Sequence, residues 1–211
     1  MINTKPITVA IADDNFIFRQ GLNKTISSFE EFSIVINEED CEVMFSLIEA
    51  SPVPPAICII DMAMPDGYKI LKQMKEKYPS IKVLILSMLN NELSIIRTIK
   101  IGANGFLLKG SSSADLREAL TAISKSEYHY PEKVQMHQTD SRDNLLVRLS
   151  YTELEMLSLS CTEMNMRQIA EQMNLSLSAA EKCKEDLLRK LNVKSRIGLV
   201  LFAMNMGVQP S

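Results

Sequence analysis

The chain has 211 residues, of which 46% are hydrophobic, and a formal net charge of −3. This length predicts one or two domains, and no apolar run reaches the ~18 residues that a membrane-spanning helix needs. The N-terminus lacks the basic and apolar regions of a secretion signal. The four cysteines are scattered without a Cys-x-x-Cys pair, so we expect a cytoplasmic protein with reduced thiols. The slightly negative charge excludes a chain that is basic throughout, so any DNA contact has to come from a local patch.

Residues 7–126 alternate between short β-branched runs and helical patterns. Strands are predicted, in chain order, at residues 7–12, 32–36, 57–61, 81–87 and 105–109. Each is followed by a helical pattern, at residues 16–26, 40–48, 67–78, 93–101 and 112–126. The first helix is expected to follow an Asn15 cap, and it carries Phe16, Ile17, Leu22 and Ile26 at helical spacing. Alternating strands and helices predict an α/β fold with a doubly wound, five-stranded parallel sheet.

The periodic pattern fades after the last of these helices. Residues 128–148 are polar and are expected to form a linker between a first domain at residues 1–127 and a second at residues 149–211. The second domain is only helical, and Ser150 and Glu153 have the spacing of a capping box at its start. Its later helices are expected at residues 166–173, 177–191 and 195–207. The short turn between the first two of these is typical of a helix-turn-helix.

Polar side chains follow four strands of the first domain. Asp13 and Asp14 come after the first strand, Asp61 ends the third, Ser87 the fourth and Lys109 the fifth. We expect them to meet, because ligands bind at the carboxyl ends of the strands in an open α/β sheet. Two like charges about 4 Å apart repel by about 4 kcal/mol at an effective dielectric constant near 20, so three carboxylates need a cation. Oxygen ligands favour Mg2+, and Asp61 can then act as a nucleophile toward phosphorus while Lys109 and Ser87 bind phosphoryl oxygens.

Residues 7–125 resemble the receiver domain of a two-component response regulator. The matching residues are Asp13-Asp14, Asp61, Met64-Pro65, Ser87, Phe106 and Lys109. The resemblance implies that a sensor histidine kinase phosphorylates Asp61. It also implies that the residue at the Ser87 position moves toward the phosphate and that the aromatic residue at the Phe106 position changes rotamer.

The resemblance further implies a metal site. Mg2+ is then held by Asp14, Asp61 and the backbone carbonyl of Ala63, with Asp13 in support. The chemistry of such a domain serves its own phosphorylation and dephosphorylation, so no enzyme with a separate substrate is expected. A metal-dependent phosphatase is disfavoured because Ala63 stands where a second Asp is needed and no substrate-cap insertion is present.

The loop after Asp61 departs from the family pattern. Members usually have two more residues between the Pro and the Gly of this turn, whereas Asp66 and Gly67 follow Pro65 directly. One interpretation is a tolerated shortening of the loop. The alternative is that Asp66 adds a fourth carboxylate and changes metal affinity or the lifetime of the phosphate.

Residues 149–207 resemble the LuxR-type helix-turn-helix that follows receivers in NarL/FixJ-type regulators. The match comprises Leu149-Ser150, Glu153, Glu155-Met156-Leu157, Ile169-Ala170-Glu171, Leu175-Ser176, Leu188-Arg189-Lys190-Leu191 and Val193-Lys194-Ser195-Arg196. The two resemblances together predict a response regulator that controls DNA binding and transcription. Phosphorylation is expected to shift the face around the fourth helix, fifth strand and fifth helix, and so to change dimerisation or release the DNA-binding domain.

The charge of the C-terminal domain weakens the prediction of DNA binding. Residues 149–211 hold seven basic and seven acidic side chains, although six of the bases lie within residues 182–196. Phosphate contacts are expected from Lys182, Lys184, Arg189, Lys194 and Arg196. Glu181 and Glu185 lie on the outward face of the recognition helix, where phosphates repel them, although Glu185 can accept from a cytosine amino group. The alternative is a phosphorylation-dependent protein-interaction regulator with weak or no DNA binding.

The last helix carries more apolar side chains than one small core needs. Leu199, Phe202 and Met206 are predicted as dimer contacts, which the resemblance also implies. A homodimer of this kind binds two DNA half-sites about 34 Å apart. The alternative is that the helix only closes the core of its own domain.

Overall fold

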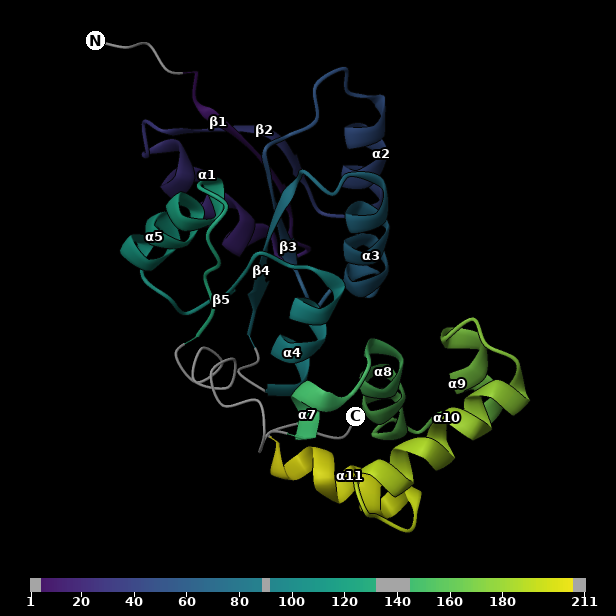
Figure 1. Ribbon diagram of the computed structural model, residues 1–211. Coiled ribbons are helices and arrows are strands. Elements are labelled where there is room, and N and C mark those ends of the chain that lie inside the picture. Colours follow the sequence, from purple (N-terminus) through teal and green to yellow (C-terminus); the bar gives the residue numbers. More distant parts are fainter. Residues whose placement is uncertain (1–4, 89–91, 132–144, 207–211) are drawn as a thin grey trace. The chain divides into compact units, whose positions relative to one another are not determined.

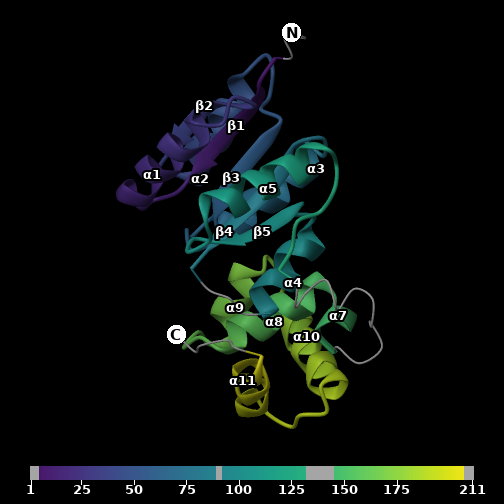
Figure 2. The same cartoon turned by 90° about the vertical axis from the view of Figure 1, so that its left-hand side faces the viewer.

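The computed structural model describes residues 5–88, 92–131 and 145–206 (Figures 1 and 2). The chain forms two compact units. The first holds residues 1–89 and 101–131, and the second holds residues 90–100 and 132–211. Among the described residues, no helix has the length and apolar character needed to cross a bilayer.

The first unit is built on a five-stranded parallel sheet with the order β2-β1-β3-β4-β5. The strands are β1 (Ile7–Ala12), β2 (Phe32–Glu38), β3 (Ile57–Asp61), β4 (Lys82–Ser87) and β5 (Gly105–Leu108). Every residue of β3 is buried, because helices cover both faces of the sheet and a central strand has no solvated side. The predicted α/β fold with a doubly wound sheet is confirmed.

Helices cover the sheet in two layers (Figure 1). The helices are α1 (Phe16–Ser27), α2 (Cys41–Ala50), α3 (Gly67–Lys77) and α5 (Ser113–Ser124). Helices α1 and α5 lie on one face, where Leu22, Ile26 and Leu120 share a core with the sheet residues Ile11 and Ile59. Helices α2 and α3 lie on the other face. The predicted Asn15 cap is present, since its side chain accepts a hydrogen bond of 3.0 Å from the Phe18 amide.

The buried face of α1 uses part of the apolar pattern. Phe16 and Ile17 are exposed, and the buried side chains of the helix are Arg19, Leu22 and Ile26. These three follow the three- and four-residue spacing of a helix face. An arginine therefore occupies the first buried position of this helix.

The chain after α5 continues onto the free edge of β5. His129 pairs with Gly105 as an isolated parallel bridge, and its carbonyl accepts a hydrogen bond of 2.8 Å from the Phe106 amide. The hydroxyl of the buried Tyr130 donates to the Ala103 carbonyl at 2.6 Å. Residues 128–131, predicted as the start of the linker, therefore belong to the first unit. Residues 132–144 of that predicted linker lie outside the described residues.

The second unit is helical. Its helices are α4 (Glu92–Ile101), α7 (Leu145–Arg148), α8 (Tyr151–Ser160), α9 (Met166–Gln172), α10 (Leu177–Lys190) and α11 (Arg196–Asn205). The predicted capping box at the start of α8 is present, with Ser150 and Glu153 bonded reciprocally. The α9–α10 turn contains Asn174 with φ of 52°, a left-handed conformation that Asn tolerates. These two helices form the predicted helix-turn-helix.

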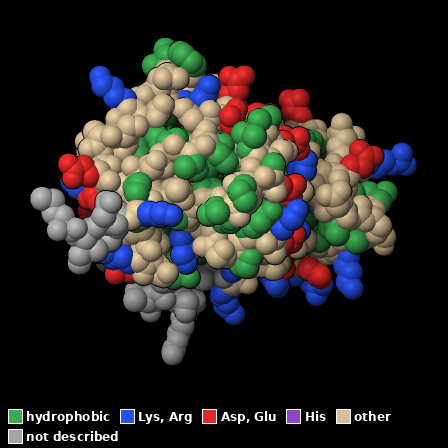
Figure 3. All heavy atoms as spheres, turned by 90° about the horizontal axis from the view of Figure 1, so that it is seen from above, with side chains coloured by type: hydrophobic (Ala, Val, Ile, Leu, Met, Phe, Trp, Pro, Cys, Tyr) green, Lys and Arg blue, Asp and Glu red, His purple; other side chains and the backbone are tan. Residues whose placement is uncertain are grey.

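Charged side chains are mixed on the surface. On the face shown in Figure 3, acidic and basic side chains are interspersed, and several hydrophobic side chains lie toward the middle. Both signs of charge are present on this face, which agrees with the small net charge of −3.

Candidate functional site

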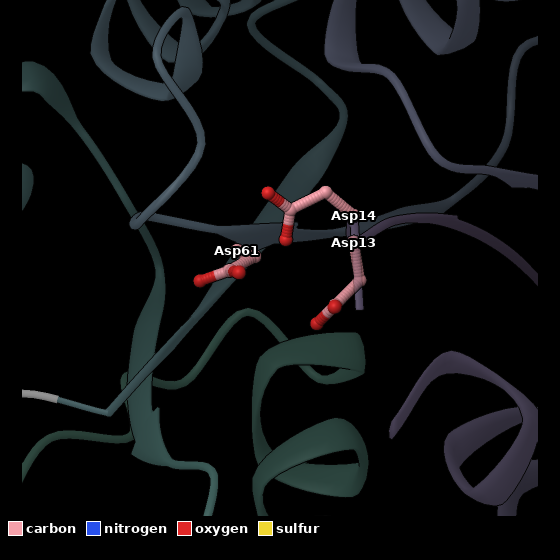
Figure 4. Close-up of side chains that lie close together, drawn as sticks. All are labelled: Asp13, Asp14 and Asp61. Atoms are coloured by element: carbon pink, nitrogen blue, oxygen red, sulfur yellow. The ribbon is translucent and has the colours of Figure 1, made fainter. Parts of the chain in front are cut away.

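Three carboxylates meet at the carboxyl edge of the sheet, as predicted (Figure 4). One oxygen from each of Asp13, Asp14 and Asp61 lies within 4.8 Å of the others. The sheet causes this meeting, because β1 and β3 are neighbours in parallel register and end at the same level. Asp13 and Asp61 are each only 1% exposed, whereas Asp14 is open to solvent.

Lys109 joins two of these carboxylates. Its Nζ atom lies 2.7 Å from Asp13 Oδ2 and 2.8 Å from Asp61 Oδ2. The backbone places it there, since the Lys109 amide donates to the Ser87 carbonyl at 2.9 Å and continues the pairing of β5 with β4. The sequence prediction that Lys109 lies beside Asp61 is confirmed by this geometry.

The electrostatics of the cluster are dominated by burial and by this ion pair. Burial raises the pKa of Asp13, and the hydrogen bond from Lys109 only partly offsets that effect. For Lys109, burial opposes the charge, but hydrogen bonds to Asp13 and Asp61 outweigh it and the pKa is raised. Three carboxylates and one ammonium leave a formal excess of two negative charges when all are ionised, a number that a divalent cation balances.

The donor set fits a hard divalent cation. All the nearby ligand atoms are carboxylate oxygens, which Mg2+ prefers over nitrogen or sulfur ligands. Asp13 Oδ2 is buried, and the Lys109 ammonium lies 2.7 Å from it. The Ala63 amide donates to Asp61 Oδ1 at 2.9 Å, which fixes one oxygen of that carboxylate and the start of the following loop. An acidic cluster of this kind is typical of Mg2+ binding.

The two predicted switch residues lie on adjacent strands beside the cluster. Ser87 ends β4 and is buried, and it pairs with Leu108 of β5. Phe106 is buried in β5, and its amide is bonded to the His129 carbonyl. The aromatic residue is therefore tied by its backbone to the chain that leaves the first unit.

Three supporting residues of α1 and the loop before it were not predicted as site residues. The Phe18 ring lies 4.6 Å from Lys109 Nζ, a cation–π distance. The guanidinium of Arg19 donates to the Asp13 carbonyl, and the Asn15 amide donates to Asp13 Oδ1 at 2.9 Å. The helical spacing from Arg19 to Leu22 and Ile26 is the one sequence signal that indicates an inward-facing arginine.

The shortened loop brings α3 close to the end of β3. A Cβ atom on Gly67 would lie 3.2 Å from the Asp61 carbonyl oxygen, so a glycine suits this approach. Asp66 precedes the helix, and its carboxylate lies 3.7 Å from Lys69 Nζ. Among the described carboxylates, the cluster contains Asp13, Asp14 and Asp61 but not Asp66.

The outward face of α10 has the predicted mixed character. Glu181, Lys182, Glu185 and Arg189 are exposed, and Lys184 is partly buried. Arg189 forms an ion pair with Asp186 on the same helix. Lys194 is exposed just before α11. The face therefore offers both cations that can contact phosphates and carboxylates that phosphates repel.

Arg196 has a different role from the predicted phosphate contact. Its guanidinium donates to three backbone carbonyls, those of Ser160 at 2.9 Å, Met164 at 2.7 Å and Thr162 at 2.5 Å. These carbonyls lie at the end of α8 and in the turn before α9. Arg196 therefore holds the start of α11 to this turn through three hydrogen bonds inside the domain.

The predicted dimer residues are not the most exposed residues of α11. Leu199 is fully buried in the core of the second unit, and Phe202 and Met206 are partly buried against that core. The exposed apolar side chains are Ile197 (72%), Leu201 (56%) and Met204 (49%). Successive members of this set are four and three residues apart, so they form one stripe along the helix. The inclusion of Leu199 in the contact surface was wrong because it lies on the opposite, buried side.

A buried, lysine-paired acidic cluster at a sheet edge, on one chain with a helix-turn-helix, defines the class: a signal-dependent transcription regulator. Comparison with known proteins identifies the family. Residues 9–121 match the family described as "Response regulator receiver domain", and residues 147–203 match "Bacterial regulatory proteins, luxR family". The chain belongs to the response regulator family and carries a C-terminal LuxR-type DNA-binding domain.

Relatives of known name and structure align with nearly the whole chain. The chain is 30% identical over 212 residues to the oxygen regulatory protein NreC of Staphylococcus epidermidis, covering 93% of this chain and 96% of NreC. A solved structure of RcsB from Salmonella enterica serovar Typhimurium, bound to promoter rprA with the phosphomimetic BeF3−, superposes with a TM-score of 0.76 at 26% identity. That alignment covers 95% of this chain and 99% of RcsB. A second structure, of two RcsB dimers bound to two parallel DNAs, aligns with a TM-score of 0.62 at 27% identity, over 94% of this chain and 98% of that one.

The position of Asp66 outside the carboxylate cluster predicts that it does not control the site. We expect Asp66→Asn to lose its phosphoryl group at the wild-type rate and with the wild-type dependence on Mg2+. The measurement is decay of the phosphorylated protein at several Mg2+ concentrations, with Asp14→Asn as the control that weakens the Mg2+ dependence. A changed rate of dephosphorylation in Asp66→Asn would show that Asp66 acts as a fourth carboxylate of the site.

The hydrogen bonds of Arg196 predict a structural phenotype. Arg196→Ala leaves three carbonyls without their charged donor, so we expect a loss of about 2 kcal/mol or more from the stability of the second unit. Scanning calorimetry of the full chain measures this loss as a lower unfolding temperature. Lys194→Ala is the matched control, with an unchanged unfolding temperature and a salt slope of DNA binding reduced by about 0.9. An Arg196→Ala protein that unfolds like the wild type would contradict the assignment.

Proposed function

We propose that this protein is a cytoplasmic two-component response regulator whose Asp61 accepts a phosphoryl group from a sensor histidine kinase. The observation that carries the proposal is the geometry of Lys109, whose ammonium contacts Asp13 and Asp61 beside the exposed Asp14. Family membership supports it, because the match to the receiver family spans all of these residues. The chemistry then acts on the protein's own aspartate, and no separate substrate is involved.

Phosphoryl transfer forms one bond and breaks another. A carboxylate oxygen of Asp61 attacks phosphorus, a P–O bond forms, and the P–N bond of the kinase phosphohistidine breaks with the electron pair leaving on the imidazole. Asp14, Asp61 and the Ala63 carbonyl, with Asp13 in support, would hold Mg2+, which would neutralise negative charge at the site when bound.

The protein's own residues position the transferred group. The Lys109 ammonium lies 2.8 Å from the Asp61 carboxylate. Once Asp61 carries a phosphoryl group, the same ammonium would pair with one of the phosphoryl oxygens. The Ser87 hydroxyl is placed on the adjacent strand to donate to another phosphoryl oxygen. Asp13 holds the ammonium, and Phe18 covers it, which limits the number of positions that Lys109 can adopt.

The C-terminal domain is proposed to bind DNA half-sites as a homodimer after phosphorylation. RcsB has been described bound to promoter DNA with a phosphomimetic and as dimers on DNA, and this chain aligns with both structures over more than nine-tenths of its length. Helix α10 is the second helix of the helix-turn-helix and would lie in the major groove. Lys182, Lys184, Arg189 and Lys194 supply the cations for phosphate contacts.

A specific observation favours a second function. Glu181 and Glu185 are both exposed on α10, where phosphates would repel them. The alternative is a regulator that binds a protein partner after phosphorylation and has weak or no affinity for DNA. Fluorescence binding to genomic DNA fragments at low salt, with beryllofluoride and Mg2+, separates the two. Binding above background supports the regulator of transcription, and its absence supports the protein-interaction regulator.

The phosphoacceptor assignment predicts the result of a mass measurement. Incubation with a small phosphodonor and Mg2+ should add one phosphoryl group to the intact wild-type chain and none to Asp61→Asn. Omission of Mg2+ should suppress the gain, because the carboxylates then repel the incoming phosphate. An equal mass gain in Asp61→Asn would falsify the assignment.

The exposed apolar stripe of α11 predicts which residues form the dimer contact. We expect Ile197→Ser and Leu201→Ser to weaken self-association of the beryllofluoride-treated protein by about ten-fold each, or about 1.4 kcal/mol. Analytical ultracentrifugation measures the dissociation constant. Leu199→Ala is the contrasting variant, since a buried Leu→Ala costs about 2–5 kcal/mol of folding stability. Unchanged self-association of Leu201→Ser would show that dimers form through another surface.

A further inference from the structure

Two carboxylates and an aromatic ring lie around the charge of Lys109. Its ammonium contacts Asp13 Oδ2 at 2.7 Å and Asp61 Oδ2 at 2.8 Å, and the centre of the Phe18 ring lies 4.6 Å from the same nitrogen. A lysine ammonium carries three N–H donors, so the carboxylates can accept from two of them. The Lys109 side chain is only 6% exposed, and little water reaches this charge. The ring therefore lies where water would otherwise complete the surroundings of the ammonium.

A closed set of contacts fixes the ring beside the site. The Asn15 amide donates to Asp13 Oδ1 at 2.9 Å, and the Asn15 side chain accepts from the Phe18 amide at 3.0 Å. Asp13 Oδ2 contacts Lys109, and Lys109 contacts the Phe18 ring. The four residues thus form a ring of contacts in which each member touches the next. The backbone at the start of α1 therefore places Phe18 relative to the Asp13 carboxylate.

A cavity on the same side shows which movement the ring opposes. It has a volume of about 350 Å3 between α1 and α5, and its lining includes Phe18, Lys109, residues 111–113 and apolar residues of both helices. The four-carbon stem of a lysine is flexible. Without the ring, the ammonium would be free to turn from Asp61 toward the serine hydroxyls of this cavity.

The chemistry of a ring suits this position better than a third carboxylate. The face of an aromatic ring has a negative potential and attracts a cation, most strongly where water is excluded. A ring carries no net charge, so it adds no repulsion to a site that already holds three carboxylates. It also leaves the donors of the ammonium available for oxygen atoms. The ring therefore holds the cation without opposing the arrival of a phosphoryl group.

We propose that Phe18 is a positioning residue for phosphoryl transfer, because the face of its ring holds the Lys109 ammonium at Asp61, where it meets a phosphoryl oxygen. Phe18 acts through Lys109 and takes no part in bond making or breaking. This inference rests on the proposed phosphorylation of Asp61 and adds to it the residue that orients the lysine.

The first test needs no phosphoryl group. In proton–nitrogen spectra of the lysine side chains of the full chain, recorded without Mg2+, the Lys109 ammonium should give a signal that the ring shifts to high field. Loss of that signal in Lys109→Arg assigns it. In Phe18→Leu the signal should move to the position of an ordinary lysine or disappear through exchange with water. An unmoved signal in Phe18→Leu would overturn the contact.

Fluorination of the ring separates its charge distribution from its shape. Phenylalanine with one, two or three ring fluorines at position 18 keeps nearly the same size and weakens the negative potential of the ring face. The rate of phosphorylation by a small phosphodonor at saturating Mg2+ is measured on the full chain by intact mass. It should fall with each fluorine, by about ten-fold at three, with an unchanged Mg2+ dependence. Phe18→Leu should be at least as slow, and Phe18→Tyr, which keeps the ring, should react at nearly the wild-type rate.

Phe29 provides the matched control. Its ring also lies beside a cation of the first unit, at 5.5 Å from the Arg117 guanidinium. The same fluorinated residues at position 29 should leave the rate unchanged. Scanning calorimetry of every variant records any loss of folding, and the fluorinated series carries the test even where Phe18→Leu unfolds at a lower temperature.

The outcomes separate this inference from the proposed function. If the wild type is phosphorylated on Asp61 and the fluorinated Phe18 variants react at its rate, the role of Phe18 is overturned and the phosphoacceptor assignment stands. If fluorination at Phe29 slows the reaction equally, the effect does not pass through Lys109 and the role is again overturned. If the wild type and Asp61→Asn gain equal mass, the phosphoacceptor assignment itself fails, and the spectrum of the Lys109 ammonium still decides the ring contact.

Discussion

The contact of the Lys109 ammonium with two carboxylates is the interaction on which the acidic cluster of the first unit depends. It lies between Asp13 and Asp61, which are almost fully buried and would otherwise repel each other. Three strand ends must stop at the same level for this contact to exist, so the parallel order of β1, β3 and β5 in the sheet is a condition for the site. The remaining excess of negative charge is one that a divalent cation would balance at this edge.

The supports of that contact are shared with the rest of the first unit. Arg19 and Asn15 hold Asp13 from the α1 side, and Phe18 covers the ammonium. On the other side, the backbone of Phe106 is bonded to His129, at the start of the chain that leads to the second unit.

The second unit shows how one residue type can serve opposite purposes. Arg189 and Arg196 are both basic residues near the recognition helix, yet Arg189 is exposed and Arg196 is bonded to three carbonyls. Leu199 and Leu201 are two residues apart on α11, and one is buried while the other is exposed. Composition and charge count these residues alike, because neither measures the direction of a side chain in the folded domain.

The sequence by itself determined the alternation of strands and helices, the cluster of Asp13, Asp14 and Asp61, and the helix-turn-helix. These follow from local periodicity, from capping residues and from the rule that parallel strands end at one edge. Only the tertiary structure decided that Arg19 faces inward, that Arg196 braces a turn, and that α4 packs with α8 through Arg97 and Glu155. Each of these contacts joins groups that are separate in the chain and chemically ordinary, so their partners are set by packing and cannot be read from spacing.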